Sequence, residues 1–103
     1  MIKVNYVVSN NLIKSVSIKG HAFYDTYGKD IVCAAVSSIV TTTINDILAL
    51  TEDKIKYDTQ DGNVLITVVS DNEVVEKLLN VMVNMLKELA SDYPKNIKIG
   101  GLK

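Results

Sequence analysis

The hydrophobic pattern of this chain changes between the two-residue period of strands and the longer period of helices, and it does so twice in the same order. Apolar and polar residues alternate over 2–8 and again over 13–19, which is typical of β-strands. The polar residues at 9–11 favour a turn between them. We therefore expect an N-terminal hairpin that ends at Gly20.

A long helical segment follows. From Ile31 to about Leu50, apolar residues recur at spacings of three and four, which predicts a helix that is apolar around most of its circumference. Asp30 is the expected N-cap, because its carboxylate can accept a hydrogen bond from an unpaired amide of the first turn. The broad apolar surface favours burial against a sheet and leaves room for contact with a second subunit.

A second hairpin and a second helix repeat this order. Residues 54–59 and 64–69 have strand patterns, and the Asp-Gly pair within 60–63 is a strong hairpin signal. Ser70 and Glu73 have the spacing of a capping box at a helix start. The stripe that we expect on the buried face of this helix is Val75, Leu78, Leu79, Met82, Met85, Leu86 and Leu89.

The last strand completes the fold prediction. The second helix ends before Pro94, and Ile97 and Ile99 alternate with Lys98 and Gly100. The order ββαββαβ over residues 1–103 predicts one α+β domain, a two-layer sandwich with a mostly antiparallel sheet and two long helices. A chain of 103 residues and 11.3 kDa is the usual size for one hydrophobic core.

Composition excludes several classes of protein. With 48% hydrophobic residues and a net charge of −1, the chain is too apolar for intrinsic disorder. We expect no membrane span, because no apolar run approaches about 20 residues, and no secretory signal after Met1. One cysteine forms no internal disulfide, so we expect a cytoplasmic protein.

The basic residues argue against direct nucleic-acid binding. All 11 are lysine, and acidic residues outnumber them by one. Surfaces that hold nucleic acid concentrate positive charge and favour the arginine fork. An enzyme, a protein-interaction module or a small-ligand binder remains.

The only cysteine and the only histidine are the candidates for chemistry. With Asp30 as cap, Cys33 is the third helical residue, where unpaired amides and the helix dipole favour the thiolate. His21 lies twelve positions earlier, close enough in sequence for a loop to bring it to the sulfur as a general base. The Asp30 carboxylate disfavours the thiolate form of Cys33 unless it accepts a cap hydrogen bond or pairs with a cation. Ser37 lies one turn beyond Cys33 on the same face of the helix.

The cysteine, the histidine and the aromatic residues near them can also have purely structural roles. A lone cysteine between Val32 and Ala34 is commonly an inert core residue, and a lone loop histidine is commonly solvated. Phe23, Tyr24 and Tyr27 can pack the loop between Gly20 and Gly28 onto the domain, or the loop can close over a peptide. One histidine and one cysteine fall short of a metal site, and nothing predicts a cofactor.

Two motifs in this region resemble a known family. Gly-His-Ala at 20–22 and Gly-Lys-Asp-Ile-Val-Cys-Ala-Ala-Val-Ser at 28–37 are similar to the signature of the ribosomal-processing cysteine proteases called Prp. Their order and separation also agree, as do the length, the ββαββαβ order and the Tyr-Pro pair before the last strand.

The resemblance implies a bacterial cytoplasmic endopeptidase that removes the N-terminal extension of large-subunit ribosomal protein twenty-seven and supports ribosome assembly. By position, Cys33 would be the nucleophile and His21 the general base, while Asp30 and Ser37 match positions near the active site. The family cuts beside aromatic residues and forms homodimers with a mobile loop beside the site, which residues 22–29 match. The alternative is a non-catalytic, ribosome-associated dimeric module that binds an extended peptide.

Overall fold

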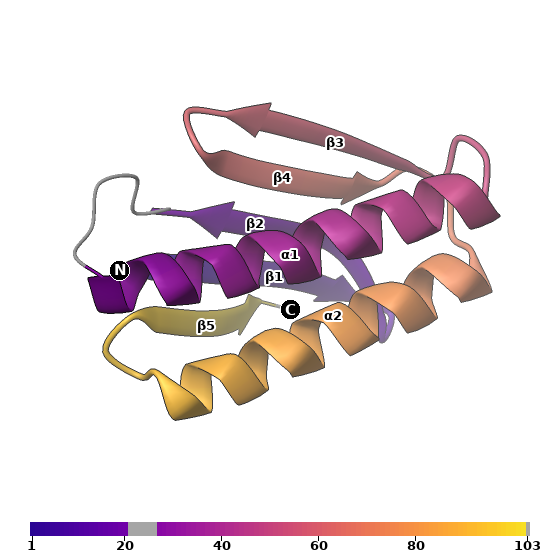
Figure 1. The fold of residues 1–103 in the computed structure, drawn as a ribbon. Helices are drawn as coiled ribbons and strands as arrows, with labels where there is room; N and C mark the ends of the chain where they lie inside the picture. The colour runs from indigo at the N-terminus through magenta and orange to yellow at the C-terminus, as the bar shows by residue number, and fades with distance from the viewer. Residues whose placement is uncertain (21–26, 103) are drawn as a thin grey trace.

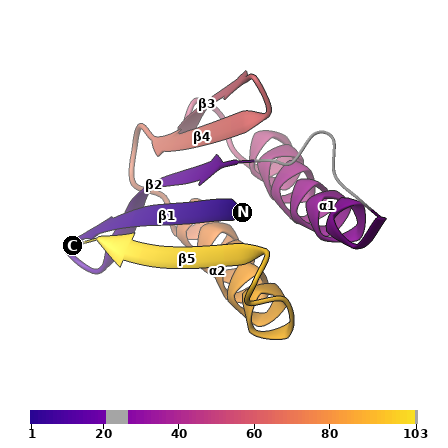
Figure 2. The ribbon, with the colours of Figure 1, turned by 90° about the vertical axis from the view of Figure 1, so that its left-hand side faces the viewer.

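The protein folds as a five-stranded sheet with both helices on one face (Figures 1 and 2). The computed structural model describes residues 1–20 and 27–102, with the backbone alone for 27–30 and 102. The elements are β1 (Ile2–Ser9), β2 (Leu12–Lys19), α1 (Tyr27–Leu50), β3 (Ile55–Gln60), β4 (Asn63–Val68), α2 (Glu73–Asp92) and β5 (Ile97–Leu102). The predicted ββαββαβ order and α+β class are confirmed.

The sheet has the strand order β3-β4-β2-β1-β5. β5 pairs with β1 in parallel, whereas the pairings β1/β2, β2/β4 and β3/β4 are antiparallel. Both hairpins close through two residues with positive φ, Asn10 and Asn11 (55° and 64°) and Asp61 and Gly62 (52° and 78°). Such turns match the right-handed twist of the strands, so both predicted hairpins are confirmed.

The core lies between the helices and one face of the sheet. Alternate strand residues point toward the helices, and Val4, Val16, Ile18 and Ile66 are fully buried there. The helical side of the core consists of Val32, Val36, Val40, Ile44 and Ile47 from α1 and Val75, Leu79, Met82, Val83 and Leu86 from α2. Neither helix covers the other face of the sheet (Figure 2).

Helix α1 begins four residues earlier than the sequence predicted. It starts at Tyr27, so the expectation that Asp30 is the N-cap is wrong, and Asp30 is the fourth helical residue. An aspartate is also favourable within the first turn, where the helix dipole attracts negative charge. The residue type alone therefore did not distinguish the two starts. Cys33 moves from the third to the seventh helical position.

Helix α2 is capped by Asn72 and not by Ser70. The Asn72 Oδ1 accepts a hydrogen bond of 3.1 Å from the Val75 amide, so the predicted capping box is wrong by two residues. The helix ends at Asp92, before Pro94 as predicted. Most of the expected stripe is buried or partly buried, but Met85 is 46% exposed and does not belong to the core.

Helix α1 contradicts the statement that no apolar run approaches about 20 residues. Its segment Ile31–Leu50 is long and apolar enough to cross a bilayer by length and composition, with a mean hydropathy of 1.7. The core helix of a water-soluble protein passes the same test, and one face of α1 packs in the core described above. Only 33% of the most apolar window is buried, so much of this surface, in which Asp46 is the one charged residue, faces outward.

Candidate active site

Cys33 lies in the N-terminal half of α1 and is partly buried. It packs against the core at its edge, between the fully buried Val32 and Val36. Reactive cysteines are characteristically in such partly accessible positions, whereas inert structural cysteines are enclosed. The position is therefore compatible with a nucleophile that a substrate can reach.

The new start of α1 changes the surroundings expected for the sulfur. A helix leaves the amides of its first four residues unpaired, here residues 27–30. Cys33 is three residues beyond the last of them, about 4.5 Å along the helix axis. The expectation that Cys33 lies within the first turn, next to these amides, is therefore wrong. Ser37 is one turn beyond Cys33 on the same helix and is exposed.

Gly20 follows the last residue of β2 in a conformation that suits glycine. Its φ is +79°, and a Cβ added there would lie 2.4 Å from the Met1 carbonyl oxygen. Both the backbone angle and the close approach exclude an ordinary side chain. The Gly20 amide donates a hydrogen bond of 3.1 Å to the Asn63 Oδ1. This hydrogen bond joins the residue after β2 to the first residue of β4.

The remaining candidates lie partly outside the described residues. His21 and Tyr24 both belong to the undescribed segment 21–26. Tyr27, Gly28 and Asp30 were expected in a loop or at a cap, and their backbone forms the first turn of α1. The structure places the end of β2 and the start of α1 at the same end of the molecule (Figure 1).

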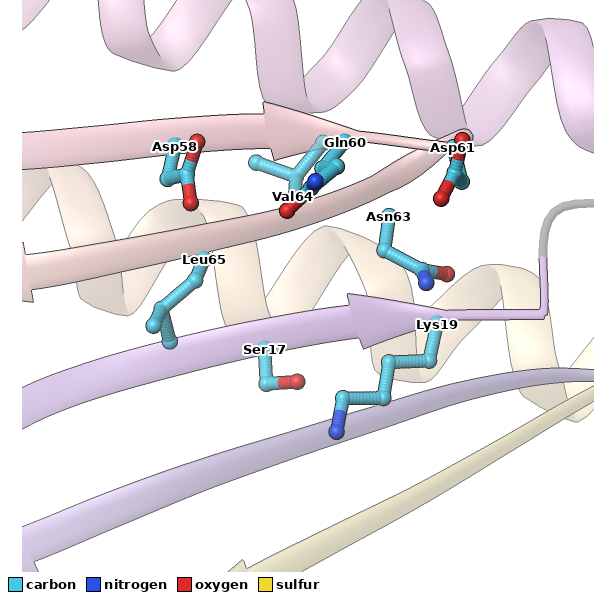
Figure 3. A pocket seen from close by; sticks show the side chains of 8 residues that line it. All are labelled: Ser17, Lys19, Asp58, Gln60, Asp61, Asn63, Val64 and Leu65. Atoms are coloured by element: carbon cyan, nitrogen blue, oxygen red, sulfur yellow. The ribbon is translucent and has the colours of Figure 1, made fainter.

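A surface hollow that the sequence did not predict includes Asn63 in its lining. It has a volume of about 370 Å³ and lies on the face of the sheet opposite the helices (Figure 3). Its lining residues are Ser17, Lys19, Asp58, Gln60, Asp61, Asn63, Val64 and Leu65. The only sequence signal was the turn at 60–63, which by itself predicts a hairpin and no site.

Within the part of the chain that the structure describes, no three His, Cys, Asp or Glu side chains gather where they could hold a metal ion. The two ion pairs among these residues, Lys14–Asp71 at 2.8 Å and Lys77–Glu73 at 3.2 Å, do not include Cys33 or Gly20.

The sequence is similar to known proteases over nearly its whole length. A family model described as cysteine protease Prp matches residues 1–98. A relative from Staphylococcus aureus, named ribosomal processing cysteine protease Prp, is 32% identical over 103 residues, which is 96% of this chain and 97% of the relative. A relative of the same name from Mycoplasma genitalium is also 32% identical over 103 residues, covering 96% of this chain and 94% of the relative.

The fold agrees with a solved structure of the same kind. The crystal structure of an essential ribosomal processing protease Prp from S. aureus, with a covalently linked product peptide, matches with a TM-score of 0.89 and 30% identity. The match covers 98% of this chain and 99% of that chain. The resemblance seen in the motifs is confirmed: the chain belongs to the cysteine protease Prp family.

Proposed function

We propose that this protein is an endopeptidase that removes the N-terminal extension of large-subunit ribosomal protein twenty-seven and so supports ribosome assembly. Its relatives are named ribosomal processing proteases, and the S. aureus structure holds a covalently linked product peptide. One observation carries the assignment of the nucleophile. A cysteine protease needs a cysteine, and Cys33 is the only one in the chain.

The same reasoning supports His21, the only histidine, as the general base. His21 takes the proton of the Cys33 thiol, and the sulfur attacks the scissile carbonyl carbon. The C–N bond then breaks, and His21 returns the proton to the leaving amine. Water hydrolyses the thioester, which releases the extension as a carboxylic acid and restores the thiol.

Supporting roles fall to residues around this pair. Asp30 and Ser37 stand three residues before and four residues after Cys33, the spacings that put residues on one face of a helix. Gly20 and Gly28 bracket the segment that holds Tyr24 and Tyr27, which offers aromatic contacts for a peptide substrate. The proposed reaction of Cys33 and His21 requires neither a metal nor a cofactor.

We expect the protein to act in the cytoplasm as a homodimer, with no direct contact to nucleic acid. The exposed side of α1 supports the dimer, because residues 31–45 contain no charge and Ile31 is 65% exposed.

A substitution of the exposed Thr41 by glutamate should convert the dimer to a monomer, because it would bury two charges in the interface. Light scattering measures the mass, with Asn84→Glu on α2 as the matched control. A wild-type monomer at micromolar concentration contradicts the proposal.

The substrate is tested with a peptide that spans the junction of the extension. The wild-type protein should cut it at one bond beside the aromatic residues, and mass spectrometry identifies the two products. A peptide with these aromatic residues replaced by alanine is the control and should be cut much more slowly. Specific binding without cleavage would instead support a non-catalytic peptide-binding module.

A further inference from the structure

We propose that three lysines on the open face of the sheet form a docking surface for an acidic segment of another protein. Lys19, Lys3 and Lys98, called the lysine row below, come from the neighbouring strands β2, β1 and β5. The inference goes beyond the proposed function and does not depend on it, because Cys33 lies on α1, at the other face of the sheet.

The register of the sheet places the three lysines side by side. Lys3 pairs with Lys19 across the antiparallel ladder and with Lys98 across the parallel ladder. Neighbouring strands lie about 4.8 Å apart, so the Cα atoms of the lysine row extend over about 10 Å. Figure 3 shows the Lys19 side chain extending from β2 toward β1. Three positive charges therefore lie in one short line.

Burial shows on which face of the sheet the lysine row lies. Successive side chains of a strand point to opposite faces. The lysines alternate with residues that are buried beneath the helices, namely Ile2, Val4, Ile18 and Ile97. All three lysines are themselves exposed. Their side chains therefore point to the face that neither helix covers (Figure 2).

The three strands bring no negative charge to the lysine row. β1, β2 and β5 contain four lysines and no aspartate or glutamate. Of these lysines, only Lys14 belongs to one of the two ion pairs among the described residues. Like charges placed directly opposite each other in a sheet repel and are destabilising. A partner that brings carboxylates to the lysine row relieves this repulsion when it binds.

The charges beside the lysine row favour an acidic polypeptide over a nucleic acid. Next to Lys19, the hollow on the same face is lined by Asp58 and Asp61. A nucleic acid carries a negative charge at every nucleotide, so a strand that continued along this face would bring phosphates to these carboxylates. A polypeptide can instead place acidic residues over the lysines and uncharged residues over the hollow. Same-side residues of an extended segment are about 7 Å apart, so two or three acidic residues match the row.

The test uses a fluorescein-labelled peptide in which glutamate alternates with threonine. Fluorescence anisotropy at low salt should show that the wild-type protein binds it. A variant with Lys3→Gln, Lys19→Gln and Lys98→Gln should bind about tenfold more weakly, because each exposed ion pair contributes modestly and three are lost. Binding to the wild type should also weaken as salt is added, because salt screens exposed charges.

A second triple variant separates the lysine row from the overall charge. Lys54→Gln, Lys77→Gln and Lys87→Gln remove the same charge from positions outside the three strands, in α2 and before β3. This variant should bind the peptide within about twofold of the wild type. A peptide with glutamine in place of glutamate should bind to none of the proteins, and urea unfolding checks that both variants are folded.

Three results would overturn the proposal. The first is a wild-type protein that does not bind the glutamate peptide at low salt. The second is an equal loss of binding in both triple variants, because the net charge and not the lysine row would then be responsible. The third is a labelled oligouridine that binds more tightly than the peptide and is lost in the Lys3, Lys19 and Lys98 variant, which would assign the row to nucleic acid.

Discussion

Replacement of Cys33 by alanine is expected to reduce cleavage of the junction peptide by at least about a thousandfold, because removing the nucleophile of a protease removes the covalent step. The chain offers no second cysteine to replace it. The fold should persist, since Cys33 is only partly buried and lies at the edge of the core. Quenched-fluorescence cleavage and thermal unfolding measure the two effects.

The single thiol allows an independent check on the same residue. One equivalent of iodoacetamide should inactivate the wild-type protein, with the label found only on Cys33 by mass spectrometry. Cys33→Ala should take no label, and Cys33→Ser should stay folded with little activity, because a hydroxyl is a poorer nucleophile. Cleavage at the wild-type rate by Cys33→Ala would exclude the proposed mechanism.

Replacement of Gly20 by alanine is expected to have the second largest effect. The new Cβ would lie 2.4 Å from the Met1 carbonyl oxygen, and the φ of +79° is unfavourable for alanine. Backbone strain of this kind costs about 1–3 kcal/mol, and the strand end must move to relieve the clash. Since His21 follows Gly20, we expect cleavage to fall about a hundredfold.

Gly101→Ala in β5 is the matched control for crowding alone. A Cβ there would lie 2.7 Å from the Tyr6 ring, at the sheet edge formed by β5. This variant should lower the unfolding temperature but leave cleavage per folded molecule unchanged. Urea unfolding gives the folded fraction of each variant, against which the cleavage rates are compared. A Gly20→Ala variant that loses stability but no activity per folded molecule would show that the close packing of Gly20 serves the fold only.

The strands and hairpins could be predicted from the sequence because their signals are local. Alternation over 2–8 and 13–19 determines which face of each strand is buried. The Asp-Gly pair at 61–62 favours the positive φ values that close the second hairpin. Neither prediction needs knowledge of residues far along the chain.

The helix starts show where local signals are insufficient. Asp30 and Ser70 both have the chemistry of a cap, yet α1 begins at Tyr27 and α2 is capped by Asn72. Several neighbouring residues can satisfy the same unpaired amides, and the packing of the whole helix selects among them. The stripe on α2 was wrong at two positions, because Met85 is exposed and Val83, which the stripe left out, is buried in the core.

The sequence by itself determined the order of the elements, the family motifs, and the single cysteine and histidine available for catalysis. Only the tertiary structure decided that Cys33 is the seventh helical residue and that Asn63 meets Gly20. Periodicity and turn chemistry act between neighbouring residues and can be recognised in the chain. Contact between two strand ends depends on the register of the whole sheet, which no local pattern contains.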